Sequence, residues 1–301
     1  MIARQRFASE NEKKQYVKEC EEDFEARLDG VIRSLCETKG LRFVTLSGPT
    51  CSGKTTASRK MVSEFKERGK NVKIISIDDF FKDRTVLERE AMASGGKLDF
   101  DSEKALDLPE LSSFMEKIQR GESARLPRFD FVEARRVRFD SFSVGDNDIV
   151  IFEGIQAIYP AFTSLIEKGS GLKSFYISPL EKLYVGEHVI APREMRLWRR
   201  IVRDYKFRAA SPEFTFHLWE SVTENEDKNI LPFAFGTDFS ISSLLGYEPC
   251  MLKNELTEIL SEVKKDSKYY EKTCGILALL REVDGISPEY LPENSLYHEF
   301  I

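Results

Sequence analysis

Residues 48–55 of this chain read Gly48-Pro49-Thr50-Cys51-Ser52-Gly53-Lys54-Thr55. The spacing is a complete G-x-x-x-x-G-K-[ST], in which glycines let the backbone fold around an anion and successive N–H groups point at it. An apolar, β-rich stretch at 41–47 leads into the motif, and residues 56–61 leave it with helical character. This strand–loop–helix context separates a phosphate-binding loop from a glycine-rich turn with a chance Lys-Thr pair. It predicts binding of a nucleoside triphosphate, and we expect ATP.

The chemistry of such a loop assigns roles to its residues. We expect Lys54 to reach the β- and γ-phosphates and the Thr55 hydroxyl to bind a Mg²⁺ ion that accompanies ATP. The other ATP contacts expected from the loop and the helix that follows it are Gly48, Thr50, Cys51, Ser52, Gly53 and Thr56.

The composition excludes several classes of protein. With 301 residues, 41% of them hydrophobic, the chain can bury one large α/β domain with additions or two small ones. A net charge of −6 argues against nucleic-acid binding by the whole molecule. No apolar run approaches the about 20 residues of a membrane span, and no secretory signal is visible. Five cysteines without C-x-x-C spacing indicate a reducing, cytoplasmic environment, while assembly into a homo-oligomer stays open.

Apolar strands alternate with helical segments along the chain. This order, with the loop after the first strand, predicts an α/β fold with a doubly wound parallel sheet flanked by helices. The expected strands are 41–47, 72–77, 149–152, 172–177 and a last one at 247–252, with a helix at 253–265. The expected organisation is an N-terminal helical segment at 1–40, a core domain at 41–265 with an acceptor-binding insertion at about 79–147 and a lid at about 193–212, and a C-terminal helical tail at 266–301.

Two carboxylates follow apolar strands directly. Asp78, which precedes Asp79, comes after strand 72–77 and can accept the proton of an attacking hydroxyl or join the Mg²⁺ shell. Either aspartate can instead cap a helix. Glu153 ends the run 149–152 and can hold the metal through water, or be an exposed carboxylate at a strand end. Because ligands in such folds sit at the carboxyl ends of the strands, we expect both side chains beside the phosphate loop.

A strongly basic helix is predicted at 193–207. Arg196, Arg199, Arg200 and Arg203 share one face at i, i+3, i+4, i+7 spacing, where their charges would repel one another unless an anion lay between them. Guanidinium groups match phosphate geometry well, so this helix is expected to cover the phosphates of ATP. The alternatives are a solvated basic face or a nucleic-acid contact.

The order of these motifs resembles the phosphoribulokinase/uridine kinase family, specifically its uridine kinase-like branch of P-loop kinases. The resemblance covers about residues 41–255. It rests on the phosphate loop and on the following stretches: 76–81, 99–101 with Ala105 and Asp107, 127–136, 151–155, 196–204, 218–222 and 228–233.

The resemblance implies roles for the residues that match it. Asp78 corresponds to the general base that accepts the proton of a sugar hydroxyl, and Asp101 to the carboxylate that holds a vicinal diol. Arg196 corresponds to an arginine near the sugar and the transferred phosphate. The remaining matches are Arg199 and Arg200 as arginines on ATP, and Thr55 and Glu153 in the magnesium shell.

One motif departs from the family pattern. The family motif reads Pro-x-Tyr-Asp-Phe-x-x-His-x-Arg, whereas this chain has Phe129 at the Tyr position and Ala134 at the His position. In uridine kinases of the family those two polar groups read the pyrimidine edge, and such contacts carry most of the selectivity. The expected acceptor-binding residues are therefore Asp101, Phe129, Phe131, Arg136 and Arg196, with the base-reading pair altered.

The sequence thus predicts an ATP-dependent phosphotransferase acting on a hydroxyl of a nucleoside or related small molecule. Two alternatives stay open. One is a kinase for a non-nucleoside sugar alcohol, as in the phosphoribulokinase branch. The other is a nucleotide-binding regulator without transfer activity.

Overall fold

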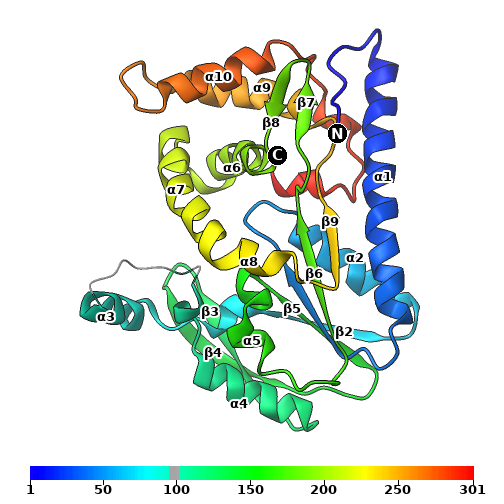
Figure 1. Ribbon diagram of the computed structural model, residues 1–301, viewed down its shortest axis with the longest axis vertical. Helices are drawn as coiled ribbons and strands as arrows, with labels where there is room; N and C mark the ends of the chain where they lie inside the picture. The colour runs from blue at the N-terminus through cyan, green and yellow to red at the C-terminus, as the bar shows by residue number, and fades with distance from the viewer. Residues whose placement is uncertain (95–99, 101) are drawn as a thin grey trace.

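A five-stranded parallel sheet forms the centre of the computed structural model, which describes residues 1–94, 100 and 102–301 (Figure 1). Its strand order is β2-β5-β1-β6-β9, and every neighbouring pair is parallel. The strands are β1 (Phe43–Ser47), β2 (Asn71–Ser76), β5 (Asp148–Glu153), β6 (Leu172–Ser178) and β9 (Phe239–Ser242). The predicted α/β fold with a central parallel sheet is confirmed. Asp101 lies outside the described residues.

The central strands are apolar because both faces of the sheet are covered. In β5, Ile149 and Ile151 belong to one hydrophobic cluster, while Val150 and Phe152 belong to the other. Successive side chains of a strand point to opposite faces, so a continuous apolar run is what a strand buried on both sides requires.

Helices form the two covering layers. One cluster joins the sheet to α1 (Glu10–Glu37), α2 (Lys54–Glu67), α6 (Pro192–Arg208) and α9 (Glu248–Ser261). The other joins it to α4 (Leu108–Gln119) and α5 (Pro160–Thr163). The N-terminal segment forms one long helix, α1, which runs along one side of the molecule next to α2 (Figure 1). Its buried residues recur at helical spacing: Val17, Glu21, Phe24, Leu28, Ile32 and Leu35.

The insertion between β2 and β5 carries its own small sheet. After a 3₁₀ turn at Ile77–Phe80 come α3 (Arg84–Ser94), a 3₁₀ turn at Glu103–Ala105 and α4. Strands β3 (Ala124–Asp130) and β4 (Arg135–Phe142) then pair antiparallel, with an irregularity between Arg128 and Phe129.

The second half of the chain adds helices and one further hairpin. A 3₁₀ turn at Ile155–Ile158 follows β5, and β7 (Leu183–Val185) pairs antiparallel with β8 (His188–Ile190). Helix α6 is followed by α7 (Pro212–Asn225), a π-helical turn (Glu226–Ile230) and α8 (Leu231–Ala234). The last elements are α10 (Tyr270–Leu280) and 3₁₀ turns at Pro288–Tyr290 and Leu296–Glu299. Within the described residues, no helix is long and apolar enough to span a membrane.

The expectation of a last strand at 247–252 was wrong. The fifth strand is β9, and α9 begins at Glu248, with Pro249 in its first turn. A short apolar run reads alike for a buried strand and a buried helix. Proline decides between them here, because it fits the first turn of a helix but removes a hydrogen bond from a central strand.

Candidate active site

The register of the sheet brings the predicted site residues to one edge. Strand β5 lies between β1 and β2, with Glu153 opposite Leu46 on one side and Ser76 on the other. The phosphate loop follows β1, and Asp78 follows β2, so Glu153 is between them. All three lie at the carboxyl ends of parallel strands, as the sequence predicted.

The phosphate loop depends on both of its glycines. A Cβ on Gly48 would lie 2.2 Å from the Ile177 carbonyl oxygen in β6, so no side chain fits there. Gly53 has φ +93°, a left-handed conformation that glycine adopts without steric cost. Cys51 also has a positive φ, of +58°, and is only 5% exposed. The loop is therefore a tight, packed structure.

The Lys54 side chain lies inside the loop. Its Nζ donates to the carbonyl oxygens of Gly48, at 2.7 Å, and Pro49, at 3.0 Å. Burial lowers the pKa of Lys54, although the charges of Glu153 and Asp78 oppose this. Burial likewise raises the pKa of Glu153, against the attraction of Lys54. Both shifts have the direction expected when the cost of desolvation exceeds the attraction between the two groups.

The arginines of α6 are neutralised by the protein itself. Arg196 is 1% exposed and donates to Glu226 at 2.5 Å, and Arg200 donates to Asp204 at 3.0 Å. The sequence argument that a bound anion must separate these arginines was wrong, because internal carboxylates supply the negative charge. Helix α6 is buried from 195 to 202 and is a packed helix of the core, so the lid expected at about 193–212 stays a prediction.

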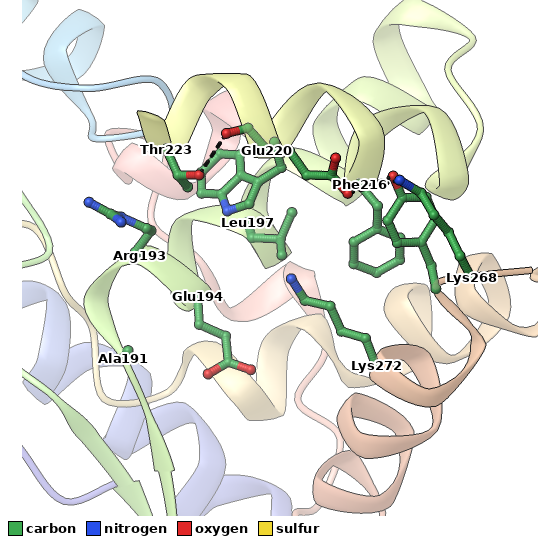
Figure 2. A pocket seen from close by; sticks show the side chains of 11 residues that line it. Ala191, Arg193, Glu194, Leu197, Phe216, Glu220, Thr223, Lys268 and Lys272 are labelled. Carbon is green, nitrogen blue, oxygen red and sulfur yellow. Dashed lines mark hydrogen bonds and ion pairs between the residues drawn. The ribbon is translucent and has the colours of Figure 1, made fainter. Parts of the chain in front are cut away.

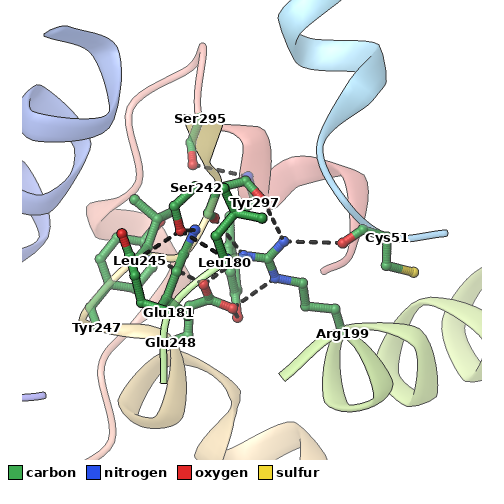
Figure 3. A network of polar contacts seen from close by, with 12 residues as sticks. Cys51, Leu180, Glu181, Arg199, Ser242, Leu245, Tyr247, Glu248, Ser295 and Tyr297 are labelled. Atoms are coloured by element: carbon green, nitrogen blue, oxygen red, sulfur yellow. Dashed lines mark hydrogen bonds and ion pairs between the residues drawn. The ribbon is translucent and has the colours of Figure 1, made fainter. Parts of the chain in front are cut away.

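Three of these arginines contact the phosphate loop. Arg196 donates to the Thr50 carbonyl at 3.3 Å, and Arg199 to the Cys51 carbonyl at 3.0 Å. Arg199 is fully buried, so the expected contact of its guanidinium with ATP is not available in this structure (Figure 3). Arg203, to which sequence reasoning gave no ATP role of its own, donates to the Thr50 hydroxyl at 3.4 Å and lines the space above the loop.

Besides the space above the loop, a pocket opens beside Asp78. It has a volume of about 370 Å³, within the usual range for small-molecule sites. The sequence predicted four of its residues, namely Asp78, Phe129, Phe131 and Ala134. It missed the other described lining residues, Phe81, Arg84, Phe100, Ile155 and Gln156. Phe81 was visible in the 76–81 motif, but only the fold shows that its ring packs 5.7 Å from Phe129.

Two expected acceptor residues lie elsewhere. The Arg136 guanidinium pairs with Asp107 at 2.9 Å, and its backbone N–H donates to Asp83. Arg196 contacts the phosphate loop, as described above. Neither is among the described residues that line the pocket beside Asp78.

Asp78 and Asp79 have different surroundings. Asp79 accepts from Arg128 at 2.9 Å and from the Phe129 backbone N–H at 3.1 Å. It therefore fixes β3 against the turn after β2. Asp78 lines the pocket, and its charge acts on Lys54. The structure thus separates a positioning aspartate from one that faces the candidate site.

The C-terminal tail also reaches the phosphate loop. Sequence reasoning assigned it no role, yet Glu299 accepts from the Thr56 backbone N–H at 2.7 Å and from the Thr56 hydroxyl at 2.6 Å. Glu299 and Phe300 line the space above the loop together with Thr50, Cys51, Ser52, Gly53, Lys54, Thr55 and Arg203. No local motif in the tail signals this contact.

A further pocket of about 630 Å³ lies between α6, α7 and α10 (Figure 2). Glu194 of α6 and Lys272 of α10 extend toward it, and Phe216 stacks on Tyr269 at 5.2 Å in its wall. Its described lining residues include none of the predicted site residues.

The magnesium expectation can be compared with the available ligands. Among the residues that the structure describes, no group of three or more His, Cys, Asp or Glu is placed to hold a metal ion. Mg²⁺ in nucleotide sites usually takes its ligands from phosphates, waters and one or two protein groups. Two protein groups fit that pattern. They are the Thr55 hydroxyl, in the space above the loop, and the Glu153 carboxylate, at the end of β5.

A parallel sheet with a phosphate loop after its first strand defines the class of P-loop nucleotide-binding proteins. The chain belongs to the phosphoribulokinase/uridine kinase family, whose model matches residues 43–246.

The uridine kinase of Mycoplasma pneumoniae is 30% identical over 168 residues, which cover 56% of this chain and 68% of that protein. The uridine kinase of Mycoplasma genitalium is 29% identical over 189 residues, 62% of this chain and 76% of that protein. A solved structure described as a possible uridine kinase from Bacillus stearothermophilus shares 18% identity, covers 51% of this chain and 80% of that one, and has a TM-score of 0.43.

Proposed function

We propose that this protein is a cytoplasmic ATP-dependent kinase that transfers the γ-phosphoryl group to a hydroxyl of a nucleoside or a related ring-bearing small molecule. One observation carries the proposal. Asp78 lines the pocket of about 370 Å³ and also acts electrostatically on Lys54 of the phosphate loop. A carboxylate in that position stands between an acceptor site and a phosphate site. The five free cysteines are consistent with a reducing compartment.

The phosphate loop would hold ATP through its backbone N–H groups and Lys54. Lys54 would exchange its bonds to the Gly48 and Pro49 carbonyls for the β- and γ-phosphates. Thr55 and Glu153 would hold a Mg²⁺ ion, which would neutralise charge on the phosphates when bound. Arg196 and Arg199 would act from behind the loop by fixing the carbonyls that they contact. Arg203 would act from the space above the loop, where it donates to the Thr50 hydroxyl.

The transfer step follows from the position of Asp78. The oxygen of the acceptor hydroxyl would form a bond to the γ-phosphorus, while the bond from that phosphorus to the bridging oxygen of ADP breaks. Asp78 would accept the hydroxyl proton as general base. Lys54 would stabilise the negative charge that develops on the phosphates.

The walls of the acceptor pocket favour a ring. Phe129 packs edge-on against Phe81 at 5.7 Å and against Phe131 at 5.3 Å, so phenyl faces and edges dominate one side. Such walls suit a planar ring better than an open-chain sugar alcohol, which would need more hydrogen-bond partners. The exposed Arg84 guanidinium adds one cation at the rim. A vicinal diol on the acceptor stays a prediction that depends on Asp101.

A substrate screen tests the proposal. ADP release would be measured with Mg·ATP over purine and pyrimidine nucleosides, sugars and polyols. We expect turnover with at least one nucleoside-like acceptor, and loss of about 10²–10³ in kcat for Lys54→Ala. Lys70→Ala, an exposed lysine just beyond α2, is the matched control and should behave as the wild type. Turnover of only polyols would favour the sugar-alcohol kinase, and ATP binding without turnover would favour the regulator. Wild-type turnover by Lys54→Ala would contradict the site.

A further inference from the structure

The C-terminal segment, residues 295–301, packs against the phosphate loop, and the proposed function does not explain this contact. Leu296, Tyr297 and Phe300 are all buried, so the segment is packed rather than loosely attached. Leu296 Cδ1 lies 3.8 Å from the position of a Cβ built on Gly53. Glu299 and Phe300 also line the space above the loop, so this segment borders the position that a nucleotide would occupy.

The Glu299 carboxylate occupies hydrogen-bond donors that a nucleotide needs. One oxygen, Oε1, accepts both the backbone N–H and the hydroxyl of Thr56, at 2.7 and 2.6 Å. Thr56 lies in the first turn of α2, where backbone N–H groups have no partner within the helix. In a phosphate loop these first-turn donors bind phosphate oxygens. Glu299 thus stands where a phosphate oxygen of the nucleotide would stand.

The space directly above the loop is small. The cavity bounded by the loop, Arg203, Glu299 and Phe300 measures about 130 Å³. Lys54 is also turned onto the loop's own carbonyls, Gly48 and Pro49. Both the cation and the first-turn donor of the loop therefore have partners from within the chain.

The segment is held on both sides of Glu299, by Tyr297 and by the buried Phe300, which leaves the Glu299 side chain as the part able to move. The Ser295 hydroxyl donates to Glu21 at 2.5 Å in buried surroundings. The Tyr297 hydroxyl donates to Glu248 at 3.4 Å, also in buried surroundings (Figure 3). Glu299 itself is half-buried, and its carboxylate accepts the two hydrogen bonds from Thr56. A change in the conformation of the Glu299 side chain would free the Thr56 donors while Tyr297 and Phe300 stay in place.

We propose that Glu299 is an intramolecular competitor of the nucleotide, holding the phosphate loop closed until its carboxylate turns away from Thr56. The inference rests on the proposed binding of a nucleotide at the loop, and adds a regulatory contact to it. A closed state populated about 90% of the time lowers apparent nucleotide affinity about 10-fold, because only the open fraction binds. Two negative groups, the carboxylate and the phosphates, cannot share the Thr56 donors.

The proposal is tested by measuring nucleotide affinity in the absence of an acceptor. Isothermal titration calorimetry with Mg·ADP would compare the wild type, Glu299→Ala, Glu299→Gln and Glu293→Ala. We expect Glu299→Ala to lower Kd about 10-fold, and Glu299→Gln to lower it less, since an amide oxygen can still accept from Thr56. Glu293→Ala removes the same charge from an exposed position of the tail and should leave Kd unchanged.

Each outcome decides between the alternatives. An unchanged or higher Kd for a folded Glu299→Ala protein, checked by circular dichroism, would overturn the competition and make Glu299 a structural cap of α2 or a nucleotide ligand. Because binding rather than turnover is measured, this failure is separate from failure of the kinase proposal. Absence of nucleotide binding in every variant would overturn both.

Discussion

Arg199 and Glu248 form a fully buried ion pair directly behind the phosphate loop. Arg199 Nη2 lies 2.6 Å from Glu248 Oε1, and Nε lies 2.7 Å from Oε2, with both side chains 0% exposed. Burial opposes the charge, but the Glu248 carboxylate raises the pKa of Arg199 above its usual value. The same guanidinium donates to the carbonyls of Cys51 and Ser243. The pair therefore ties the loop after β1 to the start of α9.

Breaking this pair should destabilise the whole domain. We expect Glu248→Gln to lower the free energy of unfolding by about 3–5 kcal/mol, because it leaves a buried guanidinium without its counter-charge. Urea unfolding followed by circular dichroism measures this. The exposed pair of Glu220 with Lys268, 3.1 Å apart, is the control, and Glu220→Gln should leave the unfolding midpoint nearly unchanged. Equal midpoints for the two variants would contradict the structural role of the buried pair.

Substitutions of the neighbouring Asp78 and Asp79 should change different kinetic constants. Asp78→Asn should retain ATP binding and lose about 10²–10⁴ in kcat, because only the proton acceptor is removed. Asp79→Asn should act on KM for the acceptor and on stability, since Asp79 holds Arg128 and the Phe129 backbone. Steady-state kinetics and calorimetric ATP binding distinguish them. A collapse of ATP affinity in Asp78→Asn, with kcat retained, would make Asp78 a metal ligand instead.

The charged Glu153 side chain should lower the stability of the fold while serving as a proposed magnesium ligand. Burial raises the pKa of its carboxyl above the ordinary 4.5, against the charge of Lys54 and a hydrogen bond from Ser58. The folded state then binds this proton more tightly than the unfolded state. The resulting stability is fully present below about pH 4.5 and is lost as pH rises through the raised pKa.

We therefore expect Glu153→Gln, which stays neutral, to have a higher Tm than the wild type near pH 7 without Mg²⁺, and a smaller advantage at acidic pH. Its kcat should fall because a proposed magnesium ligand is gone. Calorimetric melts across pH measure the first effect, with Glu67→Gln, an exposed carboxylate on α2, as the control. A Tm advantage independent of pH would argue against the ionisation of Glu153 as its cause.

Acceptor selectivity should follow the altered pair at the pocket wall. Phe129 and Ala134 present no hydrogen-bond donor to a pyrimidine edge, so we expect uridine and cytidine to be poor substrates. Restoring Phe129→Tyr with Ala134→His should raise kcat/KM for uridine about 10-fold or more. Ala134 has φ +51°, a conformation in which histidine is several-fold enriched, so the backbone accepts the change.

Steady-state kinetics with uridine and cytidine measure this selectivity. The single variant Phe129→Tyr is the control for the added hydroxyl alone. Wild-type kcat/KM for uridine above about 10⁴ M⁻¹s⁻¹, the low end of typical enzymes, would show that other residues read the base.

Local sequence was sufficient for the sheet and the phosphate loop. The conformation of residues 48–55 depends on local sequence, because it needs only glycines at fixed spacing and a helix that begins directly after them. Strand β5 was recognisable because burial on both faces demands a continuous apolar run. Parallel strands then place Asp78 and Glu153 at one edge whatever the details of the loops.

The partners of charged side chains were decided only by the tertiary structure. Arg196 and Arg199 looked like ligands for a phosphate, but Glu226 and Glu248, distant in sequence, neutralise them in the core. The contact of Glu299 with Thr56 joins residues 243 positions apart, and no local pattern encodes it. Periodicity and spacing report which face a residue lies on. They do not report which opposite charge the fold brings to it, because that depends on how distant elements pack.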